Sequence, residues 1–235
     1  MCNHYRTSPQ AVDWAPKIIR GITVPLPLPD LPEHIYPKYL APVVIQAGRG
    51  RSLVAKAWGI PIAIKGVKGQ RIEKPVTNAR NDKLTGFTWR YAVKERRCLI
   101  PATGYFEPGL GPPGAKDEIL FTVRERPCFF FAGLWEGNAF TMVTTEPNEF
   151  VRQFHDRMPV VLGDADALTW LGDEPLADGD LAHLCRGLPA NALHHEVLAP
   201  KLKVIRPAKV TTGDERKSPP APPQGELFLG RFVRK

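Results

Sequence analysis

Residues 119–144, ILFTVRERPCFFFAGLWEGNAFTMVT, decide the fold class of this chain. They hold three short apolar runs, at 119–123, 128–134 and 140–144, with charged or turn-forming residues between them. Short runs rich in aromatic and β-branched residues predict β-strands, and residues 97–100 predict another. Because helices do not alternate regularly with these strands, we expect an α+β fold with a mostly antiparallel, barrel-like sheet and flanking helices.

The segments around these strands predict further elements. Ser8 and Pro9 suit the cap and the first position of a helix that continues through Trp14. We also expect a hairpin over 42–58, a strand over 158–162, and helices over 145–154, 164–171 and 178–186.

The composition is that of a globular protein. The 235 residues are 43% apolar and 24% charged, which is ordinary usage. No stretch approaches the roughly 18 apolar residues that a membrane span requires, and the first six residues lack the apolar core of a signal peptide. We therefore expect a cytoplasmic protein without a membrane partner and with reduced cysteines.

The net charge of +8 is distributed unevenly along the chain. Residues 65–97 carry 10 basic and 3 acidic side chains, whereas residues 98–200 carry 6 and 15. A concentrated basic stretch attracts the phosphates of nucleic acids. The alternative is a solvated face with counter-charges packed against it.

Proline is enriched, with 25 residues, and two clusters stand out. Residues 24–32 must run extended, because proline fixes φ and removes a donor, and the alternating leucines predict that they follow the protein surface. Residues 218–224 predict a flexible or polyproline II segment. We expect one domain over 1–210 and a Pro-rich, basic C-terminal tail over 211–235.

The four cysteines form no CxxC pair, so neither a zinc ribbon nor a thioredoxin site is expected. Cys98 and Cys128 lie in apolar runs and Cys185 lies in a predicted helix, which predicts buried, inert thiols. The adjacent His194 and His195 point to opposite faces of a strand, so we expect no metal site there and no cofactor.

Cys2 differs from the other cysteines because it follows the first methionine. Once Met1 is removed, Cys2 presents an α-amine and a thiol on adjacent carbons. An aldehyde would form a Schiff base with the amine, and the thiol would close onto the imine carbon to give a five-membered thiazolidine. The same group could instead attack an amide, with its own amine as the base. A small residue without a role is the third interpretation.

Three polar residues lie in apolar or glycine-bounded contexts: Asn78, Glu107 and His155. Desolvation between aromatic residues would raise the pKa of Glu107 toward a working acid–base range. His155 could donate to an oxyanion or a sugar hydroxyl. The structural alternatives are turn residues for Asn78 and Glu107 and a helix cap for His155.

The order of several motifs resembles the SOS-response-associated peptidase (SRAP) family. The motifs are Met1-Cys2, Trp58-Gly59 with Pro61, Asn78-Ala79-Arg80, Cys98 to Glu107, and His155-Asp156-Arg157-Met158-Pro159. The resemblance runs from residue 1 to about residue 205 and implies the fold of that family in a single domain.

The resemblance also implies a function. The family senses abasic sites in single-stranded DNA, in the response to DNA damage, and forms a thiazolidine cross-link through the residue that matches Cys2. It is thought to remove Met1 by self-cleavage, as a hydrolase with peptidase and possible lyase activity. Asn78 would hydrogen-bond near the Cys2 terminus, Glu107 would assist proton transfer, and His155 would contact the deoxyribose oxygen. We thus expect catalytic roles for all four of these residues.

The resemblance implies DNA-binding roles for Arg80, His4 and Trp58. Arg80 matches an arginine that binds phosphate. The chain departs from the family at Asn3 and His4, where the family has a glycine and a phosphate-contacting arginine. The family commonly shows more tryptophan after the residue that matches Trp58, where this chain has three isoleucines, so base stacking is expected to be weaker.

The expected partner is thus single-stranded DNA with abasic sites, bound by a monomer that associates with the nucleoid after DNA damage. Two other functions stay open. A glutamine amidotransferase with an N-terminal cysteine would also begin Met-Cys, although its Arg-Gly-Asp and Asn-Gly segments are not found. A non-catalytic binder of single-stranded DNA would need the basic stretch but not Cys2, Glu107 and His155 together.

Overall fold

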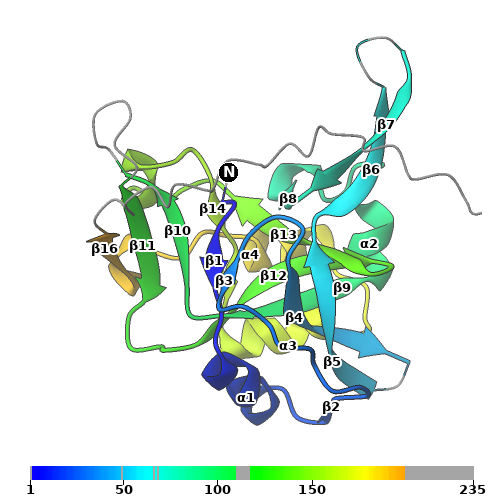
Figure 1. Cartoon of the computed structure of the whole chain (residues 1–235), viewed down its shortest axis with the longest axis horizontal. Helices are drawn as coiled ribbons and strands as arrows, with labels where there is room; N and C mark the ends of the chain where they lie inside the picture. Colours follow the sequence, from blue (N-terminus) through cyan, green and yellow to red (C-terminus); the bar gives the residue numbers. More distant parts are fainter. Residues whose placement is uncertain (1, 49, 66, 68, 110–116, 199–235) are drawn as a thin grey trace, which may run out of the picture. The chain divides into compact units, whose positions relative to one another are not determined.

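The computed structural model describes residues 2–48, 50–65, 67, 69–109 and 117–198, and Figure 1 shows that strands dominate this part of the chain. The α-helices of these residues are short: α1 (Pro9–Ile18), α2 (Arg90–Glu95), α3 (Asp164–Leu171) and α4 (Asp178–Leu184). Three turns of 3-10 helix accompany them, η1 (Asn81–Lys83), η2 (Val151–Gln153) and η3 (Ala190–Ala192). Ser8 caps α1, because its hydroxyl accepts from the Ala11 N–H at 3.2 Å.

The larger sheet forms a ring of strands. Its order is β14-β13-β12-β9-β4-β5-β2, with β15 beside β12 and β8 beside β13. β13 also pairs with β5 in parallel, and this contact closes the ring β13, β12, β9, β4 and β5. The bounds are β2 (Ile22–Thr23), β4 (Leu40–Ala47), β5 (Gly50–Trp58), β8 (Asn78–Arg80), β9 (Arg97–Ala102), β12 (Phe129–Glu136), β13 (Ala139–Thr145), β14 (Met158–Pro159) and β15 (Val161–Leu162).

A second sheet has the order β16-β11-β10-β1-β3 and is antiparallel throughout. A two-stranded hairpin, β6 and β7, projects from the rest of the fold (Figure 1). The bounds are β1 (Tyr5–Arg6), β3 (His34–Ile35), β6 (Ile60–Lys65), β7 (Arg71–Val76), β10 (Gly104–Pro108), β11 (Glu118–Val123) and β16 (Leu193–Leu198). The expected α+β fold with mostly antiparallel sheets is therefore confirmed, and the ring of five strands supports the expected barrel-like shape in part.

The alternation of side chains along β12 divides the core into two clusters. Phe130 packs in one cluster with Trp170 of α3, whereas Phe129 and Phe131 point to the other face and pack in the second. The second cluster contains Cys2, so the fold buries the N-terminal cysteine among aromatic side chains. Cys98, Cys128 and Cys185 are buried as expected.

The expected helix over 145–154 is wrong. Only η2 forms there, because the Asn148 side chain caps a short turn: its Oδ1 accepts from the Val151 N–H at 2.8 Å, and its Nδ2 donates to the Leu188 carbonyl at 2.7 Å. The expected strand over 158–162 is divided at Val160. This residue bonds to Val143 of β13 and to Ala132 of β12, so the chain crosses from one strand to the other.

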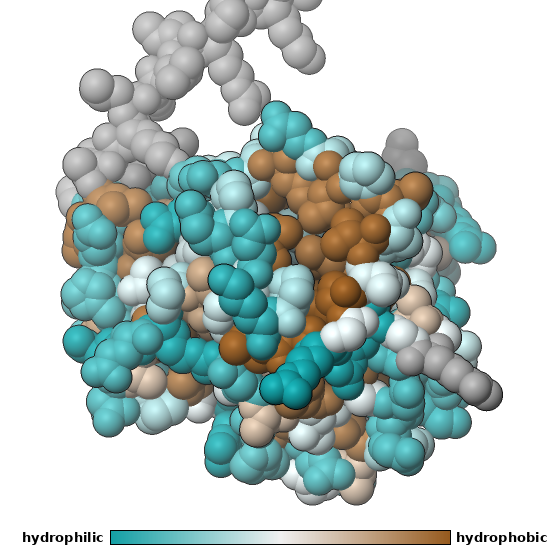
Figure 2. All heavy atoms as spheres, turned by 90° about the horizontal axis from the view of Figure 1, so that it is seen from below, coloured by the Kyte–Doolittle hydropathy of each residue, from teal (hydrophilic) through white to brown (hydrophobic). Residues whose placement is uncertain are grey.

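The proline-rich stretch 24–32 contains no helix or strand and follows the surface beside α1. Leu28 packs against the core, and residues 28–32 line a groove together with Val12 of α1. Val24 and Leu26 remain exposed, and Figure 2 shows apolar side chains gathered on the face seen from below. Residues 211–235, predicted to form a tail, the domain boundary at 210 and the proline cluster at 219–223 lie outside the described residues.

Candidate active site

The site begins where the N-terminal segment lies along β10. The Phe106 N–H donates to the His4 carbonyl at 2.9 Å, and Tyr5 of β1 is paired with Tyr105 of β10. Glu107 follows Phe106 and therefore points to the opposite face of the strand. Cys2 and Glu107 are both buried, at 1% and 2% exposure. The same carbonyl of His4 accepts from the Cys2 thiol at 3.5 Å.

Asn78 holds the N-terminal segment from the other side. It begins β8, which pairs in parallel with β13. Its Nδ2 donates to the Cys2 carbonyl at 2.9 Å and to the Thr77 hydroxyl at 2.9 Å. Its Oδ1 has no hydrogen-bond partner among the described residues, so this buried oxygen can accept a hydrogen bond from a bound molecule.

His155 approaches Glu107 from the loop between η2 and β14. Its Nε2 lies 3.9 Å from Glu107 Oε2, and its Nδ1 lies 2.9 Å from the exposed carboxylate of Asp156. The Arg157 N–H is directed at the same Nδ1 at 3.0 Å. Burial lowers the pKa of His155, which favours the neutral ring near pH 7. The structure thus brings Asn78 to Cys2 and His155 to Glu107.

The surroundings of Glu107 favour its protonated form. Burial raises the pKa of Glu107 to about 8, and the negative charge of Asp156 adds to this. Its Oε1 has no hydrogen-bond partner in the described part of the chain. Burial also raises the pKa of the Cys2 thiol, and the nearby Glu107 carboxylate raises it further. Near neutral pH the site therefore holds a protonated acid beside a neutral thiol.

Arg157 joins the loop that holds His155 to the end of β13 and to η1 after β8. This buried guanidinium donates to Glu146 Oε1 at 2.7 Å, to Asn81 Oδ1 at 2.8 Å and to the Thr144 carbonyl at 2.7 Å. These partners lie in η1 and at the end of β13, whereas Arg157 itself lies two residues after His155. The contacts therefore fix the backbone next to His155. Reasoning from the sequence gave Arg157 no role, although an arginine directly before Met158 and the apolar run 160–162 is a signal for a buried, paired charge.

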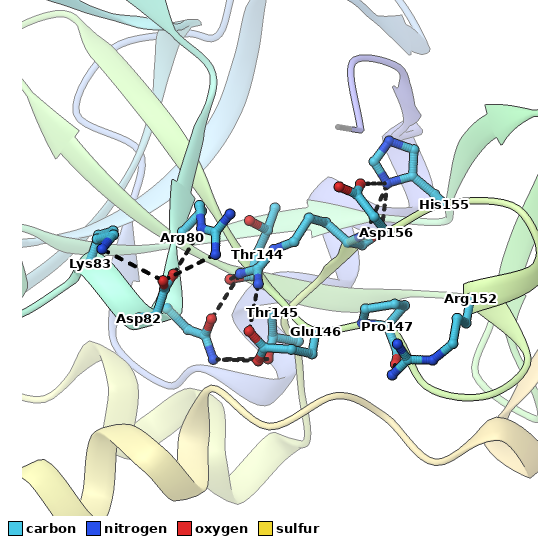
Figure 3. A network of polar contacts seen from close by, with 12 residues as sticks. Arg80, Asp82, Lys83, Thr144, Thr145, Glu146, Pro147, Arg152, His155 and Asp156 are labelled. Carbon is cyan, nitrogen blue, oxygen red and sulfur yellow. Dashed lines mark hydrogen bonds and ion pairs between the residues drawn. The ribbon is translucent and has the colours of Figure 1, made fainter.

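Arg80 lies at the surface end of β8. Its side chain is 51% exposed and makes a two-bond ion pair with Asp82, with Nε–Oδ1 at 2.9 Å and Nη2–Oδ2 at 3.1 Å (Figure 3). The geometry suits a phosphate equally well, because the guanidinium presents the same two donors to either anion.

His4 and Trp58 lack the exposed surface that contact with DNA requires. His4 is 2% exposed and stacks between Phe106 and Tyr36, while Trp58 is fully buried and donates its Nε1–H to the Thr77 carbonyl at 2.8 Å. Both residues were expected to bind DNA from motif position alone, and neither is included in the interface proposed below.

Among the described residues, no group of three or more His, Cys, Asp or Glu side chains has the arrangement of a metal site. No helix in this part of the chain has the length and apolarity needed to cross a membrane. The side chains of Cys2, Glu107, Asn78 and His155 bring to the site a thiol, a carboxylic acid, an amide and an imidazole.

Curated relatives share one description. The abasic site processing protein YoqW of Bacillus subtilis is 34% identical over 160 residues, which cover 60% of this chain and 70% of the relative. The protein of the same name from Bacillus phage SPbeta matches to the same extent. The abasic site processing protein YobE of Bacillus subtilis is 32% identical over 160 residues, covering 60% of this chain and 71% of the relative.

Solved structures share the fold. A Bordetella bronchiseptica protein superposes with a TM-score of 0.67 at 21% identity, covering 84% of this chain and 99% of that one. A Bacteroides thetaiotaomicron protein gives a TM-score of 0.65 at 20% identity, covering 84% and 92%. The family model described as SOS response associated peptidase (SRAP) matches residues 1–203. This chain therefore belongs to the SOS response associated peptidase family.

Proposed function

We propose that this protein processes abasic sites in single-stranded DNA and forms a covalent thiazolidine link to them through Cys2. The observation that carries the proposal is the burial of Cys2 beside a protonated acid, Glu107, with Asn78 bonded to the Cys2 carbonyl. The relatives named for abasic site processing support it, as does the ring-opened abasic deoxyribose, which supplies the aldehyde that a 1,2-aminothiol captures.

Removal of Met1 comes first. Hydrolysis of the Met1–Cys2 peptide bond consumes one water and leaves the α-amine of Cys2 free. We assign this step to the protein itself, as an autopeptidase, with Glu107 as the proton-transfer group and Asn78 as the residue that orients the carbonyl of Cys2. The raised pKa of Glu107 lets one group both donate and accept a proton near neutral pH.

The link then forms in balanced steps. The amine of Cys2 adds to the aldehyde carbon to give a carbinolamine, whose hydroxyl leaves as water with a proton from Glu107. The Cys2 sulfur adds to the iminium carbon, the C=N electron pair returns to nitrogen, and the thiol proton passes to Glu107. His155, 3.9 Å from Glu107, contacts the deoxyribose oxygen and assists iminium formation.

The DNA path runs over the basic surface near β8. The guanidinium of Arg80 releases Asp82 and binds a phosphate of the DNA backbone instead. The β6–β7 hairpin, which precedes β8 in the sequence, adds Lys65, Arg71 and Lys74 to this basic surface. Nonspecific binding to the phosphates is electrostatic and is therefore weakened by salt.

The test is adduct formation with an oligonucleotide that holds one abasic site. Processed wild-type protein should give a product that survives denaturation, and Cys2→Ala should give none. Cys2→Ser keeps the amine but loses the sulfur, so it should yield only an imine that borohydride traps. Cys128→Ser, at a buried cysteine outside the site, is the matched control and should behave as wild type.

The same assay separates the other functions. Glutamine hydrolysis without an adduct would establish an amidotransferase. Salt-sensitive binding without an adduct or hydrolysis would establish a non-catalytic DNA binder. Either result would overturn the proposal.

A further inference from the structure

The position of Cys2 depends on its neighbour His4. The strand that follows Cys2, β1, is only two residues long, so few ladder bonds hold the start of the chain. The His4 carbonyl accepts both the Phe106 N–H at 2.9 Å and the Cys2 thiol at 3.5 Å. A shift of His4 would therefore move the nucleophile relative to Glu107 on the same strand.

The His4 ring is fixed on both faces. It stacks on Phe106 with centroids 3.8 Å apart and planes 10° apart, and on Tyr36 at 4.2 Å and 18°. The edges of the ring are fixed as well. Nδ1 lies 3.0 Å from Glu118 Oε1, and Nε2 lies 2.8 Å from His34 Nδ1. Glu118, His4 and His34 thus form one hydrogen-bonded chain from β11 to β3.

The hydrogen-bonded chain Glu118–His4–His34 can hold only one proton between the two rings. The Glu118 carboxylate only accepts, so His4 Nδ1 carries a proton. The contact between the two rings then holds one proton, on His4 Nε2 or on His34 Nδ1. Protonation of both nitrogens would set two N–H groups against each other at 2.8 Å, and the contact would break.

Other charged and titratable groups of the described residues lie near the pair. The guanidinium of Arg6 on β1 donates to the Thr103 hydroxyl at 3.0 Å. Glu196 of β16 shares a sheet face with Glu118, since it pairs with Leu120. Among the described residues, the charged and titratable groups near the two rings include Glu118, His34, Tyr36, Arg6 and Glu196, and Cys2 contacts the His4 carbonyl.

We propose that the chain Glu118–His4–His34 is a positioning device for Cys2, and that it releases the nucleophile when a second proton enters the histidine pair. The inference rests on the proposed function, in which Cys2 must lie against Glu107. It assigns the imidazole rings of His4 and His34 as positioning groups, since their printed contacts are with each other, Glu118 and aromatic rings, and only the His4 backbone carbonyl contacts the Cys2 thiol.

Two variants test the inference through the rate of adduct formation. His4→Phe keeps the stacking but removes both edge contacts, and we expect a rate at least about tenfold lower, because a misplacement of about 1 Å can cost about 100-fold. Its affinity for undamaged single-stranded DNA should stay that of wild type. His34→Gln keeps a donor to His4 Nε2 but does not titrate. The control is His194→Gln, because His194 is exposed and is not part of the hydrogen-bonded chain Glu118–His4–His34.

The pH profile distinguishes positioning from a general structural effect. The ratio of the His34→Gln rate to the wild-type rate should be about 1 at about pH 7 and rise several-fold at about pH 5.5, because acid supplies the second proton that breaks the contact between the two rings in wild type. A ratio that does not change with pH, or a wild-type rate in His4→Phe, would overturn the inference.

A second readout does not depend on DNA. A dipyridyl disulfide reacts with thiols in acid, so its rate of reaction with Cys2 reports release of the segment, with the three other cysteines as internal references. At about pH 5.5 wild type should react faster than His34→Gln. If wild type forms no adduct, the proposed function fails, and this reaction alone decides the positioning inference; equal rates would reject it.

Discussion

At the scale of single residues, the carboxyl group of Glu107 couples stability to pH. Its pKa is raised to about 8 by burial, whereas the same group in the unfolded chain titrates near 4.3, a typical value for glutamate. Between these values the folded state binds a proton that the unfolded state has released. The free energy of unfolding therefore falls as the pH rises through this window.

Replacing Glu107 with glutamine should remove this dependence. Glutamine resembles the protonated acid and does not ionise, so Glu107→Gln should gain stability relative to wild type as the pH rises from about 5 to about 8. The gain approaches but does not exceed about 1.4 kcal/mol per pH unit. Urea unfolding of both proteins at several pH values measures it, and parallel profiles would contradict the assignment.

The ion pair between Arg80 and Asp82 should weaken DNA binding. Both side chains are partly exposed, and such pairs contribute at most about 1 kcal/mol. Asp82→Asn should therefore raise the affinity for undamaged single-stranded DNA by about two- to fivefold at low salt. Fluorescence anisotropy measures this change. Asp13→Asn on α1, which also removes one acidic charge, is the control; an equal increase there would point to net charge alone.

The sequence predicted part of this site for a physical reason. Asn78, Glu107 and His155 are polar residues in apolar settings, which is a local signal. The burial of His4 is not local, because Tyr36, Phe106, Glu118 and His34 come from three other strands or their ends. Motif position implied roles in DNA binding for His4 and Trp58, whereas the fold buries both side chains.

At the scale of elements, the β6–β7 hairpin is the most exposed basic part of the described chain near Asn78. Ile64 and Ile72 lie opposite each other and are 39% and 41% exposed, and Lys65 and Arg71 form the next pair. The hairpin lies in the sequence between Trp58-Gly59 and Asn78. A DNA strand that leaves the proposed site can therefore follow the hairpin.

Removing charge from the hairpin should reduce the salt dependence of binding. Lys65→Gln with Lys74→Gln should lower the slope of log affinity against log salt by up to about 2, one for each lost phosphate contact. The matched control is Lys17→Gln in α1 with Arg20→Gln just after it, and Figure 1 shows α1 on a part of the molecule away from β6 and β7. A slope that changes equally in both pairs would exclude a specific role for the hairpin.

The strands of the ring were predictable because each is a short apolar run with period-two burial or a continuous buried face. The helix expected over 145–154 was wrong because one side chain, Asn148, satisfies the backbone of a shorter turn. Apolar spacing does not distinguish a turn that buries its aromatic residues from a helix that does the same.

At the scale of the whole molecule, the closure of the ring was not predictable from local patterns. It rests on the parallel pairing of Ala139 with Ala57 and Phe140 with Trp58, which are far apart in the sequence. The same β13 also pairs with β12, β8 and β14, so one strand supports both the Asn78 and the His155 segments.

The residues after 210 should affect the affinity for DNA more than the rate of adduct formation. Residues 201–235 carry 9 basic and 3 acidic side chains, and the family model matches only residues 1–203. A chain that ends at residue 210 should keep the wild-type melting temperature and adduct rate at saturating DNA, while its affinity at low salt falls. Loss of the folded state in circular dichroism would show that the boundary lies further along the chain.

The dependence of both site segments on β13 also sets the moment at which the proposed self-removal of Met1 can begin. The first residues leave the ribosome early, but β8, which begins with Asn78, gains its strand partner only when residues 139–145 exist, and His155 follows still later. At about 5–20 residues per second, the N-terminus waits roughly 10 to 30 seconds for its own processing site. Self-removal of Met1 would then be an event of the nearly finished chain, and each processed N-terminus would be evidence that its domain has folded.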